Sequence, residues 1–278
     1  MRIYGLDFTS SPTRRKPITC ALCELHAAVL TVKDCLTMPS FAEFEAFLHS
    51  AGPWLAAFDF PFGQPRKLVA NLVWPQNWQG YMSIIASMSK GEFEATLHSY
   101  RATRSPGDKL HLRATDQLAG SVSPMMLHRV PVGKMFFQGA TRLFNSPISI
   151  LPCRPTSDNR IAVEGYPALV ARRLVGKRSY KSDMHGQQTI EKEMARREIV
   201  KGLRSEQLRE WYGLSVAMPG GMGELLVQDS MGDMLDAVLC ALQAGWAYMQ
   251  RERGYGIQVE CDRDEGWIVD APHPPASL

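Results

Sequence analysis

The sequence predicts an α/β fold, built on a mixed β-sheet with helices on its faces. Three β-prone runs follow one another with only short turns between them, and later strands are reached through helices. Short turns join antiparallel strands and helical crossovers join parallel ones, so we expect both kinds of pairing in one sheet. The chain has 278 residues, of which 45% are hydrophobic and 21% charged, as in a globular protein with a sizeable core.

The first quarter of the chain predicts four strands and one helix. The segment PSFAEFEAFLHSAG predicts a helix with Ser40 as its N-cap and Glu43 at the capping-box position, ended by Gly52 and Pro53. Apolar β-prone runs surround it, and the last is closed by Pro61 and Gly63. The predicted strands are 2–9, 18–25, 27–36 and WLAAFDF at 54–60.

A helical insertion is predicted at 66–155, with helices around 66–73, 91–102 and 133–144. RIAVEGYPA then predicts a fifth strand. A basic helical region runs to about Tyr212, and PGGMGE predicts a flexible loop. MGDMLDAVLCALQAGWAYMQRERG has the clearest helical spacing of apolar residues, and GIQVECDRDEGWIVDAP predicts two short strands around a turn.

Without the insertion, the predicted order is strand, strand, strand, helix, strand, strand, helix. This is the order of the ribonuclease H fold. We therefore expect one ribonuclease H-like domain over residues 1–278, with a mixed five-stranded sheet, flanking helices and the mostly helical insertion 66–155 after the fourth strand.

Two aspartates lie in otherwise apolar strands: Asp7 in IYGLDF and Asp59 in LAAFDF. Burying an unpaired carboxylate costs several kcal/mol or more unless it is paired or binds a cation. In the predicted topology the first and fourth strands are parallel neighbours, so the two side chains can share a metal ion. The alternative for each is a strand-end aspartate that caps the following turn.

Three further acids are candidates for the same site. Asp233 and Asp236 are three residues apart on the last predicted helix and so share a face. Asp233 has the alternative of favouring the helix N-terminus electrostatically. Glu164 ends the fifth predicted strand, where it has the alternative of a surface glutamate. Several carboxylates suffice for Mg²⁺ or Mn²⁺, and two such ions can catalyse phosphodiester hydrolysis.

The six cysteines are expected to be reduced thiols. Cys20 and Cys23 form a C-x-x-C, but three residues apart on a strand they face opposite sides and cannot easily chelate one metal. The chain has no apolar run of about 18 residues to span a bilayer, and its start does not resemble a secretory signal. A cytoplasmic protein is the expectation.

Positive charge is concentrated in the middle of the chain. Residues 101–204 hold 19 Lys and Arg against 8 Asp and Glu, whereas the whole chain has a net charge of +3. Such a segment suits a protein that binds nucleic acid, or it forms solvated helix faces. The candidate substrate-binding residues are Arg113, Arg172, Arg173 and Lys181.

The motifs GLDFTSSP, AFDFPFG, VEGYPA, DMLDAVLCALQA and EGWIV together resemble the DUF429 family (domain of unknown function 429), in the family's order and over nearly the whole chain. The resemblance implies a ribonuclease H fold and an inferred nuclease activity. It places the acids of the family's first and fourth strands on Asp7 and Asp59, and its Glu before Tyr-Pro on Glu164. The D-x-x-D-A helix also resembles the final acidic helix of Holliday-junction resolvases, which implies metal ligands at Asp233 and Asp236.

The leading hypothesis is a nuclease that cuts DNA or RNA with Mg²⁺ or Mn²⁺ held by Asp7, Asp59 and Asp236. Glu164 and Asp233 are further catalytic candidates. One alternative is a phosphotransferase or ATPase like actin and the sugar kinases, because GLDFTSSP resembles their first phosphate loop. Another is a non-catalytic module that binds nucleic acid. The sequence does not identify the nucleic acid or the oligomeric state.

Overall fold

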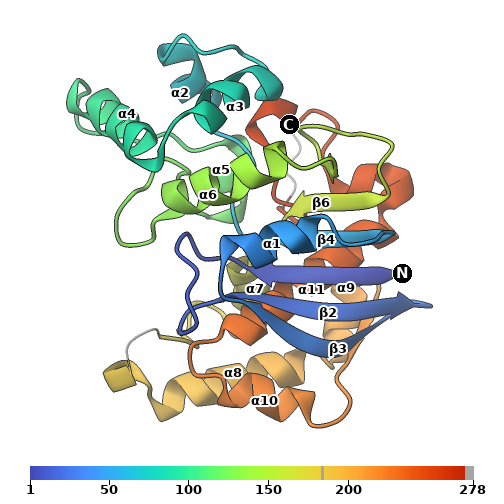
Figure 1. Cartoon of the computed structure of the whole chain (residues 1–278). Coiled ribbons are helices and arrows are strands. Elements are labelled where there is room, and N and C mark those ends of the chain that lie inside the picture. Colours follow the sequence, from blue (N-terminus) through green and yellow to red (C-terminus); the bar gives the residue numbers. More distant parts are fainter. Residues whose placement is uncertain (183–184, 273–278) are drawn as a thin grey trace, which may run out of the picture.

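The computed structural model describes residues 1–182 and 185–272, in which a central β-sheet lies between two layers of helices (Figure 1). The strands are β1 (Arg2–Asp7), β2 (Ile18–His26), β3 (Val29–Met38), β4 (Trp54–Phe58), β5 (Ser149–Ile150), β6 (Arg160–Glu164) and β7 (Ser215–Ala217). The helices are α1 (Phe41–Leu48), α2 (Arg66–Asn71), α3 (Trp78–Ser87), α4 (Lys90–Ala102), α5 (Ala114–Ala119), α6 (Val132–Phe144), α7 (Pro167–Val175), α8 (Ile190–Gly202), α9 (Glu206–Tyr212), α10 (Met222–Gln228) and α11 (Asp233–Met249). Three short 3₁₀ helices are η1 (His185–Gln187), η2 (Arg251–Gly256) and η3 (Arg263–Glu265).

The sheet of the described residues has seven strands in the order β5-β6-β4-β1-β2-β3-β7. Strand β2 pairs antiparallel with β1 and β3, and the other neighbours are parallel. The mixed α/β class and the five predicted strands are confirmed. The prediction of only five strands is wrong, because β5 and β7 are added at the two edges. They have two and three residues, too few to give an alternating pattern.

Side-chain alternation along the strands divides the core into two layers. Ile3 and Leu55 pack under α7 to α11, whereas their neighbours Tyr4 and Ala56 pack under α1 and the insertion helices. Cys20 and Cys23 fall into different layers for the same reason. The prediction that this pair faces opposite sides is confirmed, and all six cysteines are free thiols.

Helix α1 forms where its capping sequence predicts it. The Ser40 side chain accepts a hydrogen bond from the backbone N–H of Glu43 and donates one to its carboxylate. The helix then buries Phe44 and Leu48, spaced by one turn, against the sheet. Such local signals, together with an apolar stripe, were enough to predict this element.

The insertion is mostly helical, as predicted, but it has more elements. Helices α2, α4 and α6 match the predicted ones, whereas α3 and α5 were not predicted. Helix α3 is capped by Asn77, whose side chain accepts from the Gly80 N–H. Glycine inside the first turn weakens the sequence signal there. The insertion also contains β5, so its end joins the sheet instead of standing outside it.

Two predictions for the last third are wrong. The tail forms η3 and one isolated parallel bridge between Ile268 and Glu164 and not two strands, and Arg66 donates hydrogen bonds to Asp262 and Asp264 that hold the acidic turn against α2. PGGMGE is not a loop throughout, since α10 begins at Met222 inside it.

Helix α11 lies directly on the centre of the sheet, and Gly5 of β1 makes this possible. A Cβ atom at Gly5 would lie 2.1 Å from the Ala237 carbonyl oxygen and 2.1 Å from the Ala241 nitrogen. The missing side chain and the two alanines bring the helix backbone against the strand. This contact fixes the height of the N-terminal turn of α11 above the end of β1. Within the described part of the chain, no helix is both long and apolar enough to cross a lipid bilayer.

Candidate active site

Asp7 and Asp59 lie side by side at the carboxyl ends of two neighbouring parallel strands. The register pairs Leu6 with Phe58, and the Asp59 N–H continues this pairing by donating to the Leu6 carbonyl at 3.0 Å. Asp7 follows Ile3 and Gly5 on the strand face that meets α11. Asp59 follows Leu55 and Ala57 on the same face. The sheet itself therefore brings the two carboxylates together, as the strand order predicted.

The first turn of α11 adds Asp233 and Asp236 to the same place. Both side chains are buried, with exposed fractions of 6% and 1%. Asp229 sets the start of the helix, because its carboxylate accepts from the Met231 and Met234 N–H groups at 3.2 and 2.8 Å. The predicted convergence of acids from the sheet and the last helix is present in the fold.

Two lysines pair with the helix acids. Lys16, in the β1–β2 loop, donates to Asp233 at 2.6 Å, and Lys181 forms an ion pair with Asp236. Tyr180 donates its hydroxyl proton to the other oxygen of Asp236 at 2.6 Å. The side chain of Lys181 is 40% exposed. Its ammonium group can therefore leave Asp236 and bind another anion.

Burial and repulsion from neighbouring carboxylates favour the protonated form of the two strand acids. Burial, with the nearby Asp236, raises the pKa of Asp59 to about 7, although Lys181 opposes the shift. Burial also raises the pKa of Asp7 well above its ordinary range, against the attraction of Lys181 and with added repulsion from Asp236. These shifts mark a site with more carboxylates than cations, which is common at functional sites.

No family model, no curated protein and no solved structure matches the chain. The assignment of a function therefore depends on the geometry of the site.

Glu164 is placed on the other face of the sheet. It pairs in register with Phe58, one residue before Asp59, and so points toward the insertion. There its carboxylate accepts from Arg113 at 2.6 and 2.9 Å and from the Phe62 N–H at 3.0 Å. Arg113 also binds Asp116 and is 1% exposed. Glu164 and Arg113 therefore neutralise each other in a buried ion pair at the cavity wall, and the catalytic and substrate-binding roles expected from the sequence stay predictions.

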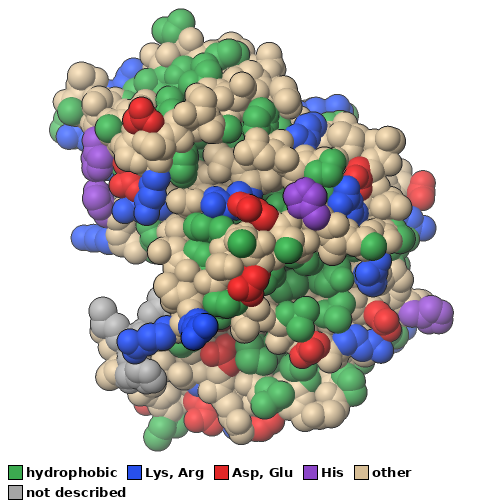
Figure 2. Space-filling model, in the orientation of Figure 1, with side chains coloured by type: hydrophobic (Ala, Val, Ile, Leu, Met, Phe, Trp, Pro, Cys, Tyr) green, Lys and Arg blue, Asp and Glu red, His purple; other side chains and the backbone are tan. Residues whose placement is uncertain are grey.

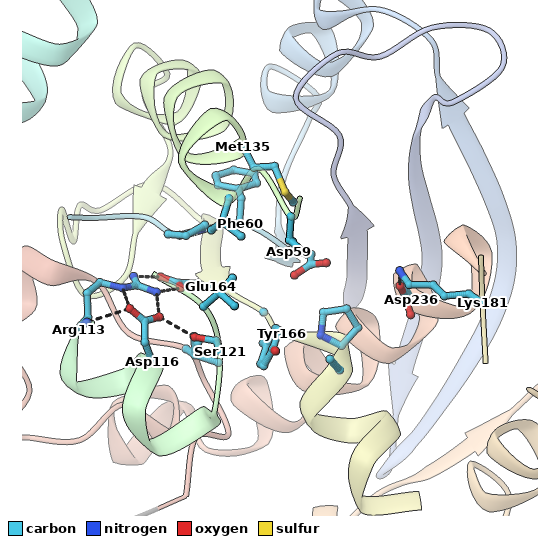
Figure 3. A pocket seen from close by; sticks show the side chains of 18 of the residues that line it. Asp59, Phe60, Arg113, Asp116, Ser121, Met135, Glu164, Tyr166, Lys181 and Asp236 are labelled. Carbon is cyan, nitrogen blue, oxygen red and sulfur yellow. Dashed lines mark hydrogen bonds and ion pairs between the residues drawn. The ribbon is translucent and has the colours of Figure 1, made fainter. Parts of the chain in front are cut away.

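A cavity of about 260 Å³ opens beside these groups (Figure 3). Asp59 projects into it between two polar clusters, one of Arg113, Asp116 and Glu164 and the other of Asp236 and Lys181. The cavity lies beyond the carboxyl ends of β4 and β6, because Asp59 directly follows β4 and the lining residues 165–168 directly follow β6. Figure 2 shows that the surface is hollowed on this side, with Lys and Arg side chains on both sides of the hollow. Of the predicted acids, Asp59, Glu164 and Asp236 line the cavity, whereas Asp7, Asp233 and the Thr9–Ser11 segment are not among its lining residues.

The predicted basic residues divide into two groups. Lys181 lines the cavity and is placed to bind an anion. Arg172 lies behind the wall, where it donates to the Tyr166 hydroxyl at 2.6 Å, and Arg173 pairs with Asp270 at 2.5 Å. Much of the basic middle is likewise neutralised by ion pairs, among them those of Arg104, Arg142, Arg160, Arg178 and Arg197.

The described residues do not hold three His, Cys, Asp or Glu side chains arranged to bind a metal ion as they stand. The ammonium group of Lys181 is bound where a cation could meet Asp236. The donor set nevertheless has the chemistry of a Mg²⁺ or Mn²⁺ site, because all its members are carboxylates and they outnumber the lysines that face them. Binding an ion would require Lys181 to leave Asp236.

Several residues of the site were not found from the sequence. Tyr180 is placed by its long-range hydrogen bond to Asp236, and Tyr166 and Met135 line the cavity from two separate elements. Nothing local distinguishes them from core residues. Side chains alternate between the two faces of the sheet along β6, and this alternation could have shown that Glu164 faces away from Asp59.

Proposed function

We propose that this protein is a metal-dependent nuclease with a ribonuclease H-like fold that hydrolyses phosphodiester bonds of DNA or RNA. The strand order β3-β2-β1-β4-β6, with β2 antiparallel to its neighbours, supports the fold. We also propose membership of the DUF429 family, since its motifs fall on the strand ends and the helix that surround the cavity.

The observation that carries the proposal is the pairing of Asp7 and Asp59 on one face of adjacent strands beneath Asp236. Among the described residues, four buried or half-buried carboxylates in this site face two lysines, Lys16 and Lys181. A divalent cation matches the remaining charge. Asp7, Asp59 and Asp236 would hold the ion, with Asp233 kept in place by Lys16.

The protein's own groups have separate tasks in this proposal. A bound Mg²⁺ or Mn²⁺ would supply Lewis-acid polarisation of the phosphodiester. Lys181 leaves Asp236 and donates a hydrogen bond to a phosphate oxygen, adding charge complementarity. Tyr180 continues to donate to Asp236 and keeps that carboxylate oriented. Arg113 and Glu164 hold the insertion against the sheet and so shape the cavity.

The test is cleavage of a panel of single-stranded, duplex, hybrid and branched substrates with Mg²⁺ or Mn²⁺. We expect cleavage that is lost with chelator and in Asp7→Asn and Asp59→Asn, while both variants stay folded by circular dichroism. Asp158→Asn, which alters an ion pair with Arg160 at the opposite end of β6 from Glu164, is the matched control and should retain activity. Binding without turnover, unaffected by metal or by either site variant, would select a non-catalytic module instead.

A further inference from the structure

The cavity has one wall that the carboxylate chemistry does not use. Besides the acids, it is lined by apolar side chains from the insertion and from the segments after β4 and β6. The apolar lining residues of this wall are Phe60, Val122, Val130, Val132, Met135 and Tyr166. A metal ion and a phosphate group need no apolar wall, so this part of the cavity fits a different portion of a ligand.

Two residues of the wall are partly exposed to solvent. Val122 is 41% exposed and Val130 is 55% exposed. Both belong to loops of the insertion, between α5 and α6, and both face the same cavity. Exposed apolar side chains that gather in a concave site indicate a ligand that covers them.

Tyr166 is held rigidly in the opposite part of the lining. Its hydroxyl accepts from Arg172 at 2.6 Å, and the Arg172 guanidinium carbon lies 5.1 Å from the ring centroid. Arg172 also donates to the Gly120 carbonyl at the end of α5, which ties the ring to the insertion. A fixed aromatic ring and a methionine are surfaces on which a flat heterocycle packs well.

We propose that the cavity binds one unpaired nucleotide, with its base against Val122, Val130, Met135 and Tyr166 and its phosphate at Asp59, Lys181 and Asp236. The cavity volume of about 260 Å³ is of the order of one nucleotide and far too small for a duplex. The preferred substrate is therefore a nucleic acid with a single-stranded, terminal or extruded nucleotide. This inference rests on the proposed nuclease function and names its substrate class.

Ser121 adds a polar contact for the base edge. Its hydroxyl lines the cavity and donates its proton to Asp116 at 2.7 Å, so the oxygen lone pairs remain able to accept from a base amino group. Asp116 is fixed in turn by two hydrogen bonds from Arg113 side-chain nitrogens, at 2.9 and 2.7 Å. The buried ion-pair network thus supports the base end of the cavity.

The test is calorimetric titration of the intact protein with adenosine 5′-monophosphate and with ribose 5-phosphate, each in saturating Mn²⁺. We expect the nucleotide to bind at least 10-fold more tightly than the sugar phosphate. Val130→Trp, which fills the wall, should remove this difference while leaving ribose 5-phosphate binding within about threefold. Val259→Trp, at a position that is 84% exposed in another part of the surface, is the control and should change neither affinity.

The outcomes separate the two proposals. Equal affinity for both probes, or a preference that survives in Val130→Trp, overturns the base-binding wall and leaves the nuclease proposal standing. Cleavage of fully paired duplex as fast as single strands, with Val130→Trp slowing neither, overturns the substrate class in the same way. Failure to bind Mn²⁺, together with failure to bind either probe, overturns both.

Discussion

Asp59 is a carboxylic acid whose ionised form the folded protein disfavours. Burial and the nearby Asp236 raise its pKa to about 7 from an ordinary value near 3.8, so the folded state binds this proton more tightly than the unfolded chain. Its contribution to the free energy of unfolding therefore becomes less favourable as pH rises from about 4 to about 7, and it is constant above that. A bound divalent cation would reverse this cost.

We expect Asp59→Asn to be more stable than the wild type at pH 8 without divalent cations, by about 1–3 kcal/mol after allowance for solvent screening, and nearly equal to it at pH 4. Urea unfolding at the two pH values measures this.

In the control Asp158→Asn the sign is reversed. Hydrogen bonds from Arg160 lower the pKa of Asp158, and their stabilising effect is present above pH 4 and lost below it. An Asp59→Asn protein that is less stable at pH 8 would contradict the charge account.

Lys181 competes with a metal ion for the carboxylates. Lys181→Met removes the ammonium group and keeps much of the apolar stem, so we expect Mn²⁺ to bind several-fold more tightly while cleavage is slowed. Titration followed by Mn²⁺ electron paramagnetic resonance measures the affinity. Lys177→Met, at an exposed position in the same segment, should leave it unchanged. A weaker Mn²⁺ affinity in Lys181→Met would mean that the lysine does not occupy the ion's place.

At the scale of elements, the contact of α11 with β1 positions the acids. Gly5→Ala places a methyl group 2.1 Å from the Ala237 carbonyl oxygen, and the helix must move. We expect a loss of about 3 kcal/mol or more in the free energy of unfolding, together with at least 10-fold weaker Mn²⁺ binding. The control is Gly91→Ala in α4, where the nearest atom to the new Cβ is 4.0 Å away. It should be neutral or stabilising by about 0.5–1 kcal/mol. Normal Mn²⁺ affinity in a folded Gly5→Ala protein would argue against this positioning.

The elements that the sequence predicted are those with a strong local signal. Ser40 and Glu43 marked the start of α1, and the apolar periodicity of 231–254 marked α11. The sequence did not predict strands β5 and β7, because short edge strands are defined by the strands that they pair with. In the site, Asp7, Asp59 and Asp236 could be predicted because a charged residue in an apolar element is conspicuous. Tyr180 and Met135 could not, because only the tertiary fold brings them to the cavity.

At the scale of the whole molecule, the Arg113 network joins the insertion to the sheet. Arg113 immediately precedes α5, Asp116 lies in α5 and Glu164 ends β6, and all three are almost fully buried. Removing one member of such a network leaves an unmatched buried charge, which costs about 3–5 kcal/mol. The geometry of the cavity therefore depends on a buried network outside the cluster of Asp7, Asp59 and Asp236.

We expect Glu164→Gln to lower the free energy of unfolding by about 2–4 kcal/mol, because Arg113 loses a charged partner but keeps Asp116. Mn²⁺ affinity should stay within twofold of the wild type, since Glu164 lies on the other face of the sheet from Asp7. Thermal unfolding and Mn²⁺ titration of the same samples measure both quantities. A 10-fold loss of Mn²⁺ affinity without loss of stability would instead make Glu164 a metal ligand.

The convergence of the sheet and helix acids on one cation is tested most directly by a crystal of the intact protein soaked in Mn²⁺. We predict an anomalous peak between the carboxylates of Asp7, Asp59 and Asp236, with the Lys181 ammonium group moved away from Asp236. A soak at saturating Mn²⁺ in which these three side chains keep their present partners, and in which the anomalous peaks lie elsewhere or are missing, would contradict the account.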